Sequence, residues 1–385
     1  MKKEDFFKNW ERIIPKPIAG EKKVGELVSE YFTAYNASRI REICYLLEKK
    51  VMREDVVVGM TLAGALTPAG LGLSCIIPLI KQGLVDWIVS TGANIYHDLH
   101  FTLNLPLYKG RPFVNDVELL NQNIIRIYDV FTSYETLNKT DRWLIKTLSK
   151  KEFQKSMGSA ELHNKLGKYA AMKEKELGLE DASILACAYR YGVPIFTSSP
   201  GDSTVGMGIA ALKLVGSRIE ISTVKDVNET SAIVYYAKEK VGRSAVIIWG
   251  GGSPKNFILQ TEPYIQEILG LPVLGHDYFI QVTDARPDTG GLSGATPQEA
   301  VSWSKINPKM LPDAIVCYSD TTIVMPIVVS YLSEKNIKRP HKRLYSKLNI
   351  LSKNLERDFL KLSGDKKSDR GNTSTIQFLQ KIRKK

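Results

Sequence analysis

Short apolar runs recur along this sequence, and each is followed by small polar residues and then by a helix-like segment. The runs are Val56–Met60, Leu84–Ser90, Val193–Thr197, Ala245–Trp249, Tyr278–Thr283 and Ala314–Tyr318. Continuous apolar runs are typical of strands that are buried on both faces, and their alternation with helices is typical of a parallel sheet. The pattern therefore predicts an α/β fold, a Rossmann-like and mostly parallel sheet with helices on both faces.

Helical segments are expected on either side of this sheet. Residues 1–50 are predicted to form an N-terminal helical extension, because apolar residues within 25–50 recur at roughly helical spacing. Residues 51–335 are the predicted α/β domain, in which segment 112–190 should be a mainly helical insertion over one edge of the sheet. Residues 336–385 are predicted to be a basic tail, partly helical and partly flexible.

The positive charge of the chain is concentrated in that tail. The 385 residues include 53 Lys and Arg and 41 Asp and Glu, which gives a formal net charge of +12. Residues 335–385 hold 16 of the basic residues and 4 of the acidic ones, so the rest of the chain is neutral overall. A uniformly basic surface that coats nucleic acid is therefore excluded.

The first half of the tail has the spacing of an amphipathic helix. Its apolar residues recur every three or four positions, at Leu344, Leu348, Leu351, Leu355 and Phe359. Two interpretations stay open for the basic face of this helix. It is either a solvated surface with a frayed end at GDKKSDRGNTS, or an arm that contacts nucleic acid or another polyanion.

No segment is expected to cross a membrane. Val56–Ile80 carries no charge and is long enough to span a bilayer, but glycines and two prolines interrupt it. A buried strand, a glycine loop and a buried helix explain it better. The N-terminus lacks the apolar core of a signal peptide. The four cysteines are widely spaced and form no CxxC motif, so neither a zinc site nor a disulfide framework is indicated, and a cytoplasmic protein is expected.

Glycine-rich and polar segments follow all six predicted strands. They are TLAGALTPAG, STGANIYHD, TSSPGDSTVG, WGGGSPKNF, TDARPDTGGLSGATPQEAVSWSK and SDTT. The carboxyl ends of parallel strands meet at one edge of a sheet, where ligands bind, and glycines there let backbone N–H groups approach phosphates. A dinucleotide is a candidate ligand. Tight turns need the same glycines, however, and neither a GxGxxG fingerprint at its usual position nor a P-loop is present.

The segment 283–306 carries the most reactive side chains. Thr296-Pro297-Gln298-Glu299 reads as a capping box, so Glu299 has a capping role available. Trp303 lies four residues further on and should share the face of Glu299. Asn307-Pro308 should stop the helix, which would place Lys305 in its last turn. There Lys305 either complements the helix dipole or, partly desolvated beside Trp303, has a lowered pKa and forms an imine as a nucleophile.

His97 and His100 could offer two metal ligands on one helix face. No third ligand is evident in the sequence, so polar roles at a strand end or helix start are favoured and no metal is expected.

These segments together resemble the deoxyhypusine synthase family, and most closely its bacterial-type deoxyhypusine synthase-like branch, which includes enzymes that make homospermidine. The resemblance covers about residues 20–335, and GLSGATPQEAVSWSK matches the family pattern SGARPDEAVSWGK. It implies NAD-dependent transfer of an aminobutyl group from spermidine, through an imine on an enzyme lysine, to an acceptor amine. It also implies a homotetramer with active sites across a subunit interface.

The resemblance assigns roles to individual residues. Lys305 would carry the aminobutyl fragment, Trp303 would pack along the polyamine, and Glu299 would pair with an ammonium group. The positions that match the family's NAD contacts are Gly64, Ala65, Leu66, Thr67, Pro68, Thr91, Gly92, Ala93, Asp202, Asp284, Ala285, Asp320 and Thr321.

Two departures from the family concern the residue before the proposed lysine and the GGG loop after the Ala245–Trp249 run. The family motif WGK is Trp303-Ser304-Lys305 here, and the added hydroxymethyl group bears on the local backbone. Asn256 replaces the histidine that follows the lysine of the GGG loop, and an asparagine does not titrate near neutral pH.

Other departures change the expected substrate pocket, in which Ser293 is also placed. Met207 and Leu292 stand where the family has two acidic residues that hold spermidine, and His97 stands where an acidic residue contacts the NAD ribose. Each lost charge-assisted contact is worth on the order of 1.5–3 kcal/mol, so the pocket must hold its substrate differently.

These changes favour an altered donor or acceptor. The first hypothesis is homospermidine synthesis, in which putrescine is the acceptor. The second is deoxyhypusine synthesis itself, in which a lysine of a translation factor is the acceptor. The third is a NAD-binding scaffold without chemistry that uses its tail to bind a polyanion.

Overall fold

A computed structural model of the chain describes residues 7, 8, 10–362, 379 and 382. Six parallel strands form its central sheet, in the order β11-β10-β9-β1-β2-β7. They are β1 (Val56–Leu62), β2 (Trp87–Ser90), β7 (Ile195–Thr197), β9 (Arg243–Trp249), β10 (Tyr278–Thr283) and β11 (Ala314–Tyr318). Read along the chain, this is the 3-2-1-4-5-6 order of the doubly wound dinucleotide-binding fold. The six predicted strands are therefore confirmed.

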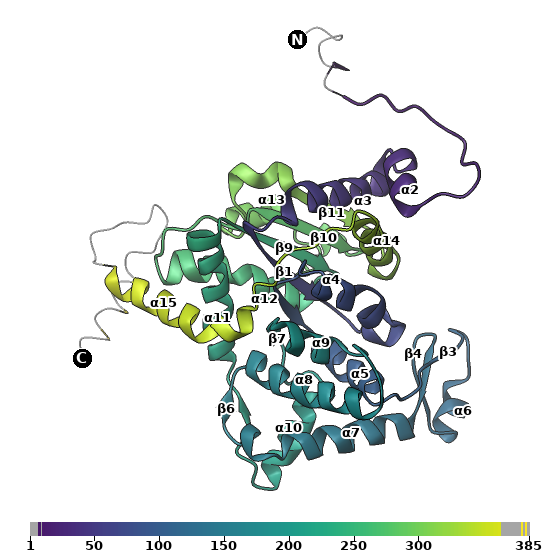
Figure 1. Cartoon of the computed structure of the whole chain (residues 1–385), viewed down its shortest axis with the longest axis vertical. Helices are drawn as coiled ribbons and strands as arrows, with labels where there is room; N and C mark the ends of the chain where they lie inside the picture. Colours follow the sequence, from purple (N-terminus) through teal and green to yellow (C-terminus); the bar gives the residue numbers. More distant parts are fainter. Residues whose placement is uncertain (1–6, 9, 363–378, 380–381, 383–385) are drawn as a thin grey trace.

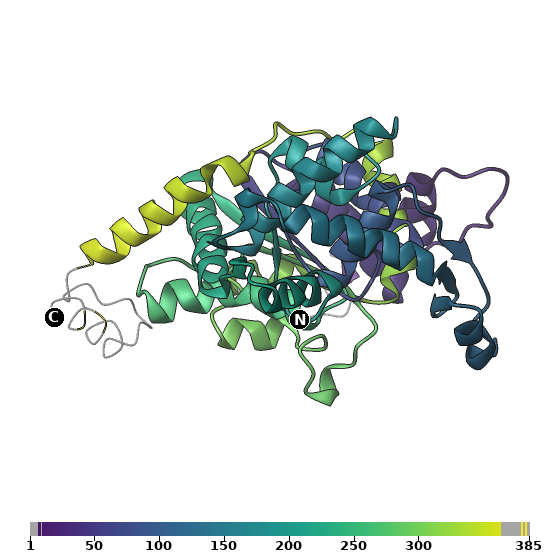
Figure 2. The same ribbon diagram turned by 90° about the horizontal axis from the view of Figure 1, so that it is seen from below.

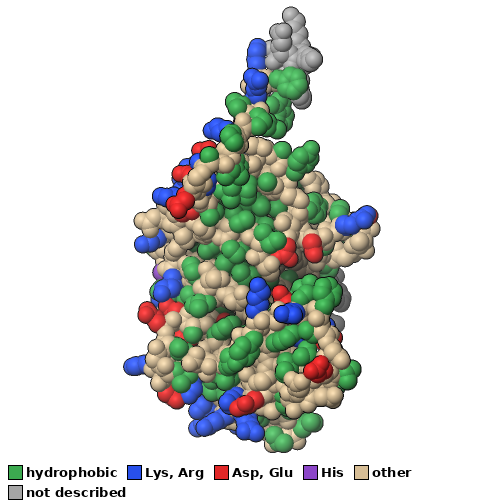
Figure 3. Space-filling model, turned by 90° about the vertical axis from the view of Figure 1, so that its right-hand side faces the viewer, with side chains coloured by type: hydrophobic (Ala, Val, Ile, Leu, Met, Phe, Trp, Pro, Cys, Tyr) green, Lys and Arg blue, Asp and Glu red, His purple; other side chains and the backbone are tan. Residues whose placement is uncertain are grey.

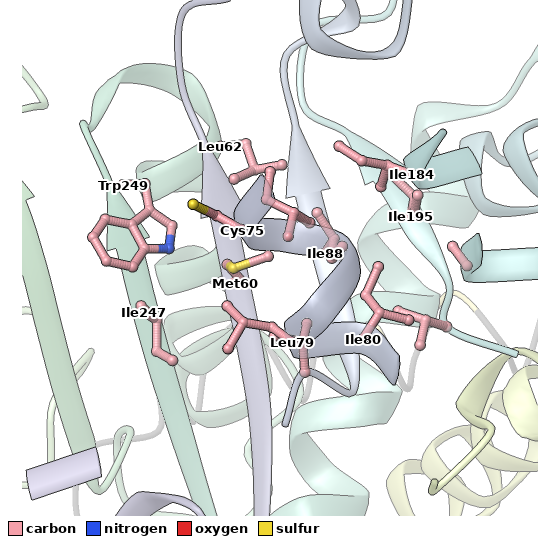
Figure 4. Close-up of a cluster of buried hydrophobic side chains, with 14 of the residues drawn as sticks. Met60, Leu62, Cys75, Leu79, Ile80, Ile88, Ile184, Ile195, Ile247 and Trp249 are labelled. Carbon is pink, nitrogen blue, oxygen red and sulfur yellow. The ribbon is translucent and has the colours of Figure 1, made fainter. Parts of the chain in front are cut away.

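The side chains of each strand alternate between two hydrophobic cores. Met60 and Leu62 of β1 pack with Ile247 and Trp249 of β9 on one face, and Figure 4 shows this cluster closed by side chains of the helix after β1. Val57 belongs to the core on the other face. Because every residue of β1 is buried, both faces must be covered, which explains why its sequence VVVGMTL is apolar almost throughout.

Helices cover both faces of the sheet, as Figure 1 shows. The helices that contribute to the core of Met60 include α2 (Val24–Tyr31), α3 (Tyr35–Leu46), α4 (Ile77–Lys81), α5 (Gly92–Thr102), α9 (Ile184–Tyr191), α10 (Thr204–Leu214) and α14 (Thr321–Glu334). Those that contribute to the core of Val57 include α11 (Thr223–Tyr236), α12 (Gly252–Pro263), α13 (Pro297–Ser302) and α15 (Leu348–Lys361). Helices on both faces, as predicted, are therefore confirmed.

The segment between β2 and β7 is mainly helical and packs at the β7 edge, as predicted. Its helices are α6 (Asp116–Asn121), α7 (Tyr134–Leu148) and α8 (Ser159–Glu176), and α8 contacts β7. The prediction missed a small antiparallel sheet of β3 (Tyr108–Lys109), β4 (Ile124–Ile127) and β5 (Val130–Ser133). These strands are short and only partly buried, so they lack a long apolar pattern; Figure 2 shows this part projecting from the body.

Shorter elements join these units. Two further strands, β6 (Ser156–Met157) and β8 (Glu220–Ile221), pair in parallel. The single helical turns are η1 (Leu47–Val51), η2 (Thr67–Ala69), η3 (Gly72–Ile76), η4 (Lys151–Phe153), η5 (Ala237–Val241), η6 (Tyr264–Ile268), η7 (Pro287–Thr289), η8 (Pro308–Asp313) and η9 (Leu344–Lys347).

The N-terminal extension is helical only in part. Helices α2 and α3 confirm the prediction for 25–50, but residues 10–23 contain no helix. Pro15 and Pro17 explain the difference, because proline cannot donate the backbone hydrogen bond of a helix interior. Figure 3 shows this end of the chain projecting from the body. Residues 1–6 and 9, which the prediction included, lie outside the described residues.

The predicted amphipathic tail helix is present as η9 and α15. Its apolar residues Leu344, Leu348, Leu351 and Leu355 are buried, and α15 packs against α11. Its apolar face is therefore part of the body, while Lys353 on the other side is exposed. The segment GDKKSDRGNTS, predicted to be flexible, lies outside the described residues.

The uncharged stretch Val56–Ile80 folds as predicted into strand β1, a loop and buried helical turns that end in α4. Among the described residues no helix is both long and apolar enough to cross a bilayer. All four cysteines are buried and free.

Candidate active site

Five of the predicted site residues line one cavity of about 180 Å³. They are Asn256, Leu292, Glu299, Trp303 and Lys305. The cavity lies between α12, α13 and the loop that follows β10, with Phe279 of β10 in its wall. The prediction that Glu299 and Trp303 share a face agrees with their common position on this cavity.

The helix α13 begins as predicted. The Thr296 side chain accepts a hydrogen bond from the Glu299 backbone N–H at 3.2 Å, and Pro297 occupies the first helical position. The carboxylate of Glu299 faces the cavity region, where its charge acts on Lys255 and Lys305.

The helix ends earlier than predicted, so the prediction that Lys305 lies in its last turn is wrong. Helix α13 stops at Ser302, and Ser304 has a φ of 58°, in the left-handed region. Ser304 N–H donates to the Val301 carbonyl and Lys305 N–H donates to the Ala300 carbonyl, both at 3.0 Å. This pair of bonds is a Schellman motif, which places Lys305 three residues beyond the last helical residue and turns its side chain back toward α12.

The Lys305 amine sits against Asn256 and Trp303. Its Nζ donates to Asn256 Oδ1 at 3.1 Å and lies 5.7 Å from the centre of the Trp303 ring. Burial lowers the pKa of Lys305, although the charges of Glu299 and Glu267 act in the opposite direction. A lowered pKa increases the neutral fraction of the amine, which is the form that attacks a carbon–nitrogen double bond.

A second lysine in the same cavity wall was not predicted as a site residue. Lys255 is 2% exposed, and its Nζ donates to Gln281 Oε1 at 2.9 Å and to the carbonyls of Ser293 and Ala295 at 3.1 and 2.7 Å. Burial lowers its pKa to about 8. Lys255 thus fastens the loop before α13 to β10. Its only sequence signal is its place beside Asn256 in the loop after β9.

Ser293 has a structural contact of its own at this junction. Its hydroxyl accepts a hydrogen bond from Gly252 N–H at 2.8 Å. A Cβ on Gly251 would lie 2.5 Å from the Cα of Ser293, so only glycine allows the loop after β9 to approach this closely.

The predicted cofactor loops after β1 and β2 are joined by Asn94, another residue that the sequence analysis did not select. Its Oδ1 accepts from the N–H groups of Leu66 and Thr67 at 2.6 and 3.2 Å. Thr91 Oγ1 donates to the Gly64 carbonyl at 2.6 Å. The burial of this asparagine is a property of the fold, so the sequence alone did not mark it.

The remaining cofactor candidates follow other strands of the sheet. A Cβ on Gly92 would meet Ser203, which brings the segment of Asp202 beside the start of α5. Asp284 and Ala285 follow β10, at the same edge of the sheet. Asp320 caps α14 by accepting from Thr322 N–H at 2.6 Å, and Thr321 is the first residue of that helix.

The backbone at the crevice between β1 and β9 fits a dinucleotide. The strand order reverses there, and ligands bind at such a point. Gly64 has a φ of 60°, and a side chain on it would meet no atom within 4 Å, so open space adjoins the backbone. Gly250 on the opposite loop is also left-handed. Because glycine has no side chain, a phosphate can closely approach the backbone there.

Three predicted pocket residues, Met207, His97 and Ser293, do not line the Lys305 cavity. Met207 is 60% exposed on α10, and His97 lies on α5. The His97 and His100 rings hydrogen-bond each other, with 3.1 Å between Nδ1 and Nε2, and burial lowers the pKa of both. Within the described part of the chain, no group of three or more His, Cys, Asp or Glu could hold a metal ion.

The strand order and the desolvated lysine define a class, an α/β protein with a dinucleotide-type sheet and a partly buried lysine amine near its carboxyl edge. The family model described as "Deoxyhypusine synthase" matches residues 26–332. The chain therefore belongs to the deoxyhypusine synthase family, whose members are aminobutyltransferases.

Relatives agree with this membership, and a solved structure shares the fold. A deoxyhypusine synthase-like protein of Nostoc punctiforme is 54% identical over 350 residues, which cover 91% of this chain and 90% of that protein. One of Thermosynechococcus vestitus is 51% identical over 351 residues, covering 90% and 88%. A candidate deoxyhypusine synthase of Entamoeba histolytica, known from its crystal structure, has a TM-score of 0.54 at 16% identity, covering 84% of this chain and 98% of that one. This last likeness shows the fold alone.

Proposed function

We propose that this chain transfers a 4-aminobutyl group from spermidine, or a related polyamine, to an acceptor amine, with Lys305 as the carrier and NAD as the cofactor. The observation that carries the proposal is the position of the Lys305 amine. It is half-buried in a cavity, beside an aromatic ring and an amide oxygen, with a pKa lowered by burial. Such a lysine is suited to forming an imine with a substrate fragment.

The residues around Lys305 have complementary tasks. The neutral amine attacks the carbon–nitrogen double bond of the oxidised donor, and 1,3-diaminopropane leaves as the enzyme imine forms. Asn256 Oδ1 accepts a hydrogen bond from the Lys305 amine and so orients the lone pair of the amine. Trp303 offers an aromatic wall to the alkyl chain and to a cationic end, and Glu299 offers a carboxylate for an ammonium group.

NAD fits the crevice between β1 and β9 in this proposal. When bound, it takes up a hydride from the donor amine and returns it after transfer. The residues that would hold it are in the loops of Gly64–Pro68 and Thr91–Ala93, with Asp202, Asp284, Ala285, Asp320 and Thr321 around them. Two observations support this placement of NAD. A side chain on Gly64 would meet no atom within 4 Å, and hydrogen bonds to Asn94 hold the loop after β1 in place.

A homotetramer with shared active sites is part of the proposal. Met207 lies outside the Lys305 cavity of its own chain and is 60% exposed. Leu214 and Val215 at the end of the same helix are 89% and 79% exposed. A second copy that covered α10 would bury these apolar side chains and could bring Met207 to a neighbouring cavity.

The acceptor in the proposal is putrescine, which gives homospermidine. Among the residues that line the cavity, Glu299 is the one acidic side chain, and Leu292 contributes apolar surface. The apolar surface suits the methylene chain of a diamine, and Glu299 would pair with one of its two ammonium groups. A translation-factor lysine is the alternative acceptor.

A product assay tests the proposal. The protein is incubated with NAD, spermidine and putrescine, and polyamines are separated by liquid chromatography and mass spectrometry. Homospermidine and 1,3-diaminopropane should appear in equal amounts, and neither should form with Lys305→Ala. Diaminopropane without homospermidine, together with labelling of an added translation factor, would replace putrescine as the acceptor. No diaminopropane under any condition would refute aminobutyl transfer.

A further inference from the structure

The peptide before Lys305 adopts a conformation that serine does not favour. Ser304 occupies the position after the end of α13 at which a Schellman motif requires a left-handed residue, with a φ of 58°. A side chain with a Cβ is strained there, whereas glycine is not. Because Lys305 directly follows, any relaxation of Ser304 would swing the Lys305 side chain away from Asn256.

Gln266 holds this strained peptide from the neighbouring turn η6. Its Nε2 donates to the Ser304 carbonyl at 2.9 Å and to Glu262 Oε2 at 3.2 Å. Both amide hydrogens of Gln266 are thereby used, which fixes the plane of its amide group. Glu262 is fully buried, so the second anchor cannot move easily.

A second contact clamps the other side of the lysine. The backbone N–H of His276 donates to the Lys305 carbonyl at 3.0 Å, and the N–H of Asn307 donates to the His276 carbonyl at 3.0 Å. Hydrogen bonds therefore hold the backbone on both sides of Lys305. Within this segment, the left-handed conformation of Ser304 is the one that costs free energy.

We propose that Gln266 is a positioning residue for Lys305: by holding the Ser304 carbonyl it keeps the left-handed turn closed and the lysine amine inside the cavity against Asn256. Without Gln266, Ser304 relaxes toward a right-handed conformation and the amine moves toward solvent. Glycine at 304 tolerates the left-handed turn without help, so Ser304→Gly should make Gln266 much less necessary. The catalytic consequence rests on the proposed function, but the geometric consequence does not.

The test compares the wild type with Gln266→Ala, Gln266→Met, Ser304→Gly and the Gln266→Ala/Ser304→Gly double variant. Gln266→Met keeps the length of the side chain and serves if the alanine variant unfolds. Gln298→Ala, which changes an exposed glutamine of α13, is the matched control. The protein is treated with an uncharged, amine-reactive acylating reagent over a range of pH. The rate at which Lys305 is acylated is followed at each pH by peptide mass spectrometry. Exposed Lys353 is the reference lysine in each sample.

Because burial lowers its pKa, Lys305 in the wild type should have its midpoint below the 10.5 of an unperturbed lysine. In Gln266→Ala and Gln266→Met the midpoint should rise, and in the double variant it should return to the wild-type position. The aminobutyl-transfer rate, kcat, should fall about tenfold in the single Gln266 variants with KM for spermidine little changed, and should recover with Ser304→Gly.

A Lys305 midpoint that stays in place in both single Gln266 variants would overturn the positioning role. So would a shift that Ser304→Gly fails to reverse. The two proposals fail differently: if the wild type transfers no aminobutyl group, the proposed function is wrong, while the labelling profiles still decide the role of Gln266.

Discussion

Ser304 shows how one residue can govern the placement of a reactive group. The family pattern quoted for this segment has glycine at this position, and the left-handed φ of Ser304 gives the physical reason. With serine at this position, the left-handed turn costs conformational free energy at the residue next to Lys305. The hydrogen bond from Gln266 partly offsets that cost.

Replacing Ser304 with glycine should stabilise the protein. The gain in free energy of unfolding is about 0.5–1 kcal/mol, because relief of the left-handed strain exceeds the entropy that glycine loses on folding. Urea unfolding measures it. Ser302→Gly is the control, since Ser302 lies within α13 and glycine there should lower stability by a similar amount. A loss of stability in Ser304→Gly would contradict the assigned strain.

Lys255 should make stability depend on pH in the alkaline range. Its pKa falls from 10.5 in the unfolded chain to about 8 in the folded state, so the unfolded state binds more protons between these values. This contribution to the free energy of unfolding therefore rises with pH from about 8 to 10.5, on the order of 3 kcal/mol in total. The measurement is urea unfolding across this range in the wild type and in Lys255→Met.

The difference in free energy of unfolding between the wild type and Lys255→Met, followed across the pH range, gives the contribution of the Lys255 amine. Lys255→Met should lack the rise, and at pH 7 it should also lose stability because the carbonyls of Ser293 and Ala295 lose a buried donor. Parallel pH profiles in both proteins would show that Lys255 keeps an ordinary pKa.

At the scale of single elements, the strands were predictable and the end of α13 was not. Buried parallel strands give long apolar runs, so β10 and β11 were predicted with their observed bounds. The stop signal Asn307-Pro308 lies beyond the true end of α13, which depends on a left-handed serine. No local sequence rule marks a serine as left-handed, because its φ is fixed by contacts with residues distant in sequence.

The site residues also divide into those that the sequence predicted and those that it did not. Residues after strands could be placed at one edge of the sheet from topology, and the resemblance assigned Asn256 and Lys305 to one site; the structure brings their side chains into contact. Lys255, Asn94 and Gln266 escaped because their importance lies in hydrogen bonds to backbone groups far along the chain. Such bonds leave no periodic or spacing signal in the sequence.

The loop after β1 should lose its shape when Asn94 is changed. Asn94→Ala leaves the N–H groups of Leu66 and Thr67 without their acceptor, which should cost about 2 kcal/mol of stability. Because this loop holds five of the positions assigned to NAD, the Kd for NAD should rise about tenfold. Thermal unfolding and a fluorescence titration with NAD measure the two effects. Asn121→Ala, at the exposed end of α6, should change neither, and an unaltered Kd in Asn94→Ala would separate the loop from cofactor binding.

At the scale of the whole molecule, the first part of the basic tail belongs to the folded body. Arg339 is 5% exposed, and its guanidinium donates to Asp86 Oδ2 at 2.9 Å and to the carbonyls of Gly83 and Val56. Beyond it, α15 buries its leucines against α11. Of the net +12 of residues 335–385, +6 lies in residues 335–347 and +1 on α15, so more than half of the excess charge belongs to the folded body and is not confined to a free arm.

Two truncations should separate these parts of the tail. A chain that ends at Lys335 loses the partner of buried Asp86 and the leucines of α15, so it should be destabilised by more than about 5 kcal/mol and should not fold stably. A chain that ends at Leu362 keeps both and should melt within a few degrees of the full protein. Circular dichroism on the two truncated proteins gives the comparison, and a stable, active chain ending at Lys335 would contradict the packing described for this segment.

The central claim, that Lys305 carries the transferred fragment, is tested most directly by trapping it. Borohydride is added during turnover with NAD and spermidine, and the protein is digested and examined by peptide mass spectrometry. We predict a reduced 4-aminobutyl adduct on Lys305, absent when NAD or spermidine is omitted and absent in Lys305→Ala. Turnover to diaminopropane with Lys305 unmodified, or an adduct on Lys255 in place of Lys305, would contradict the account.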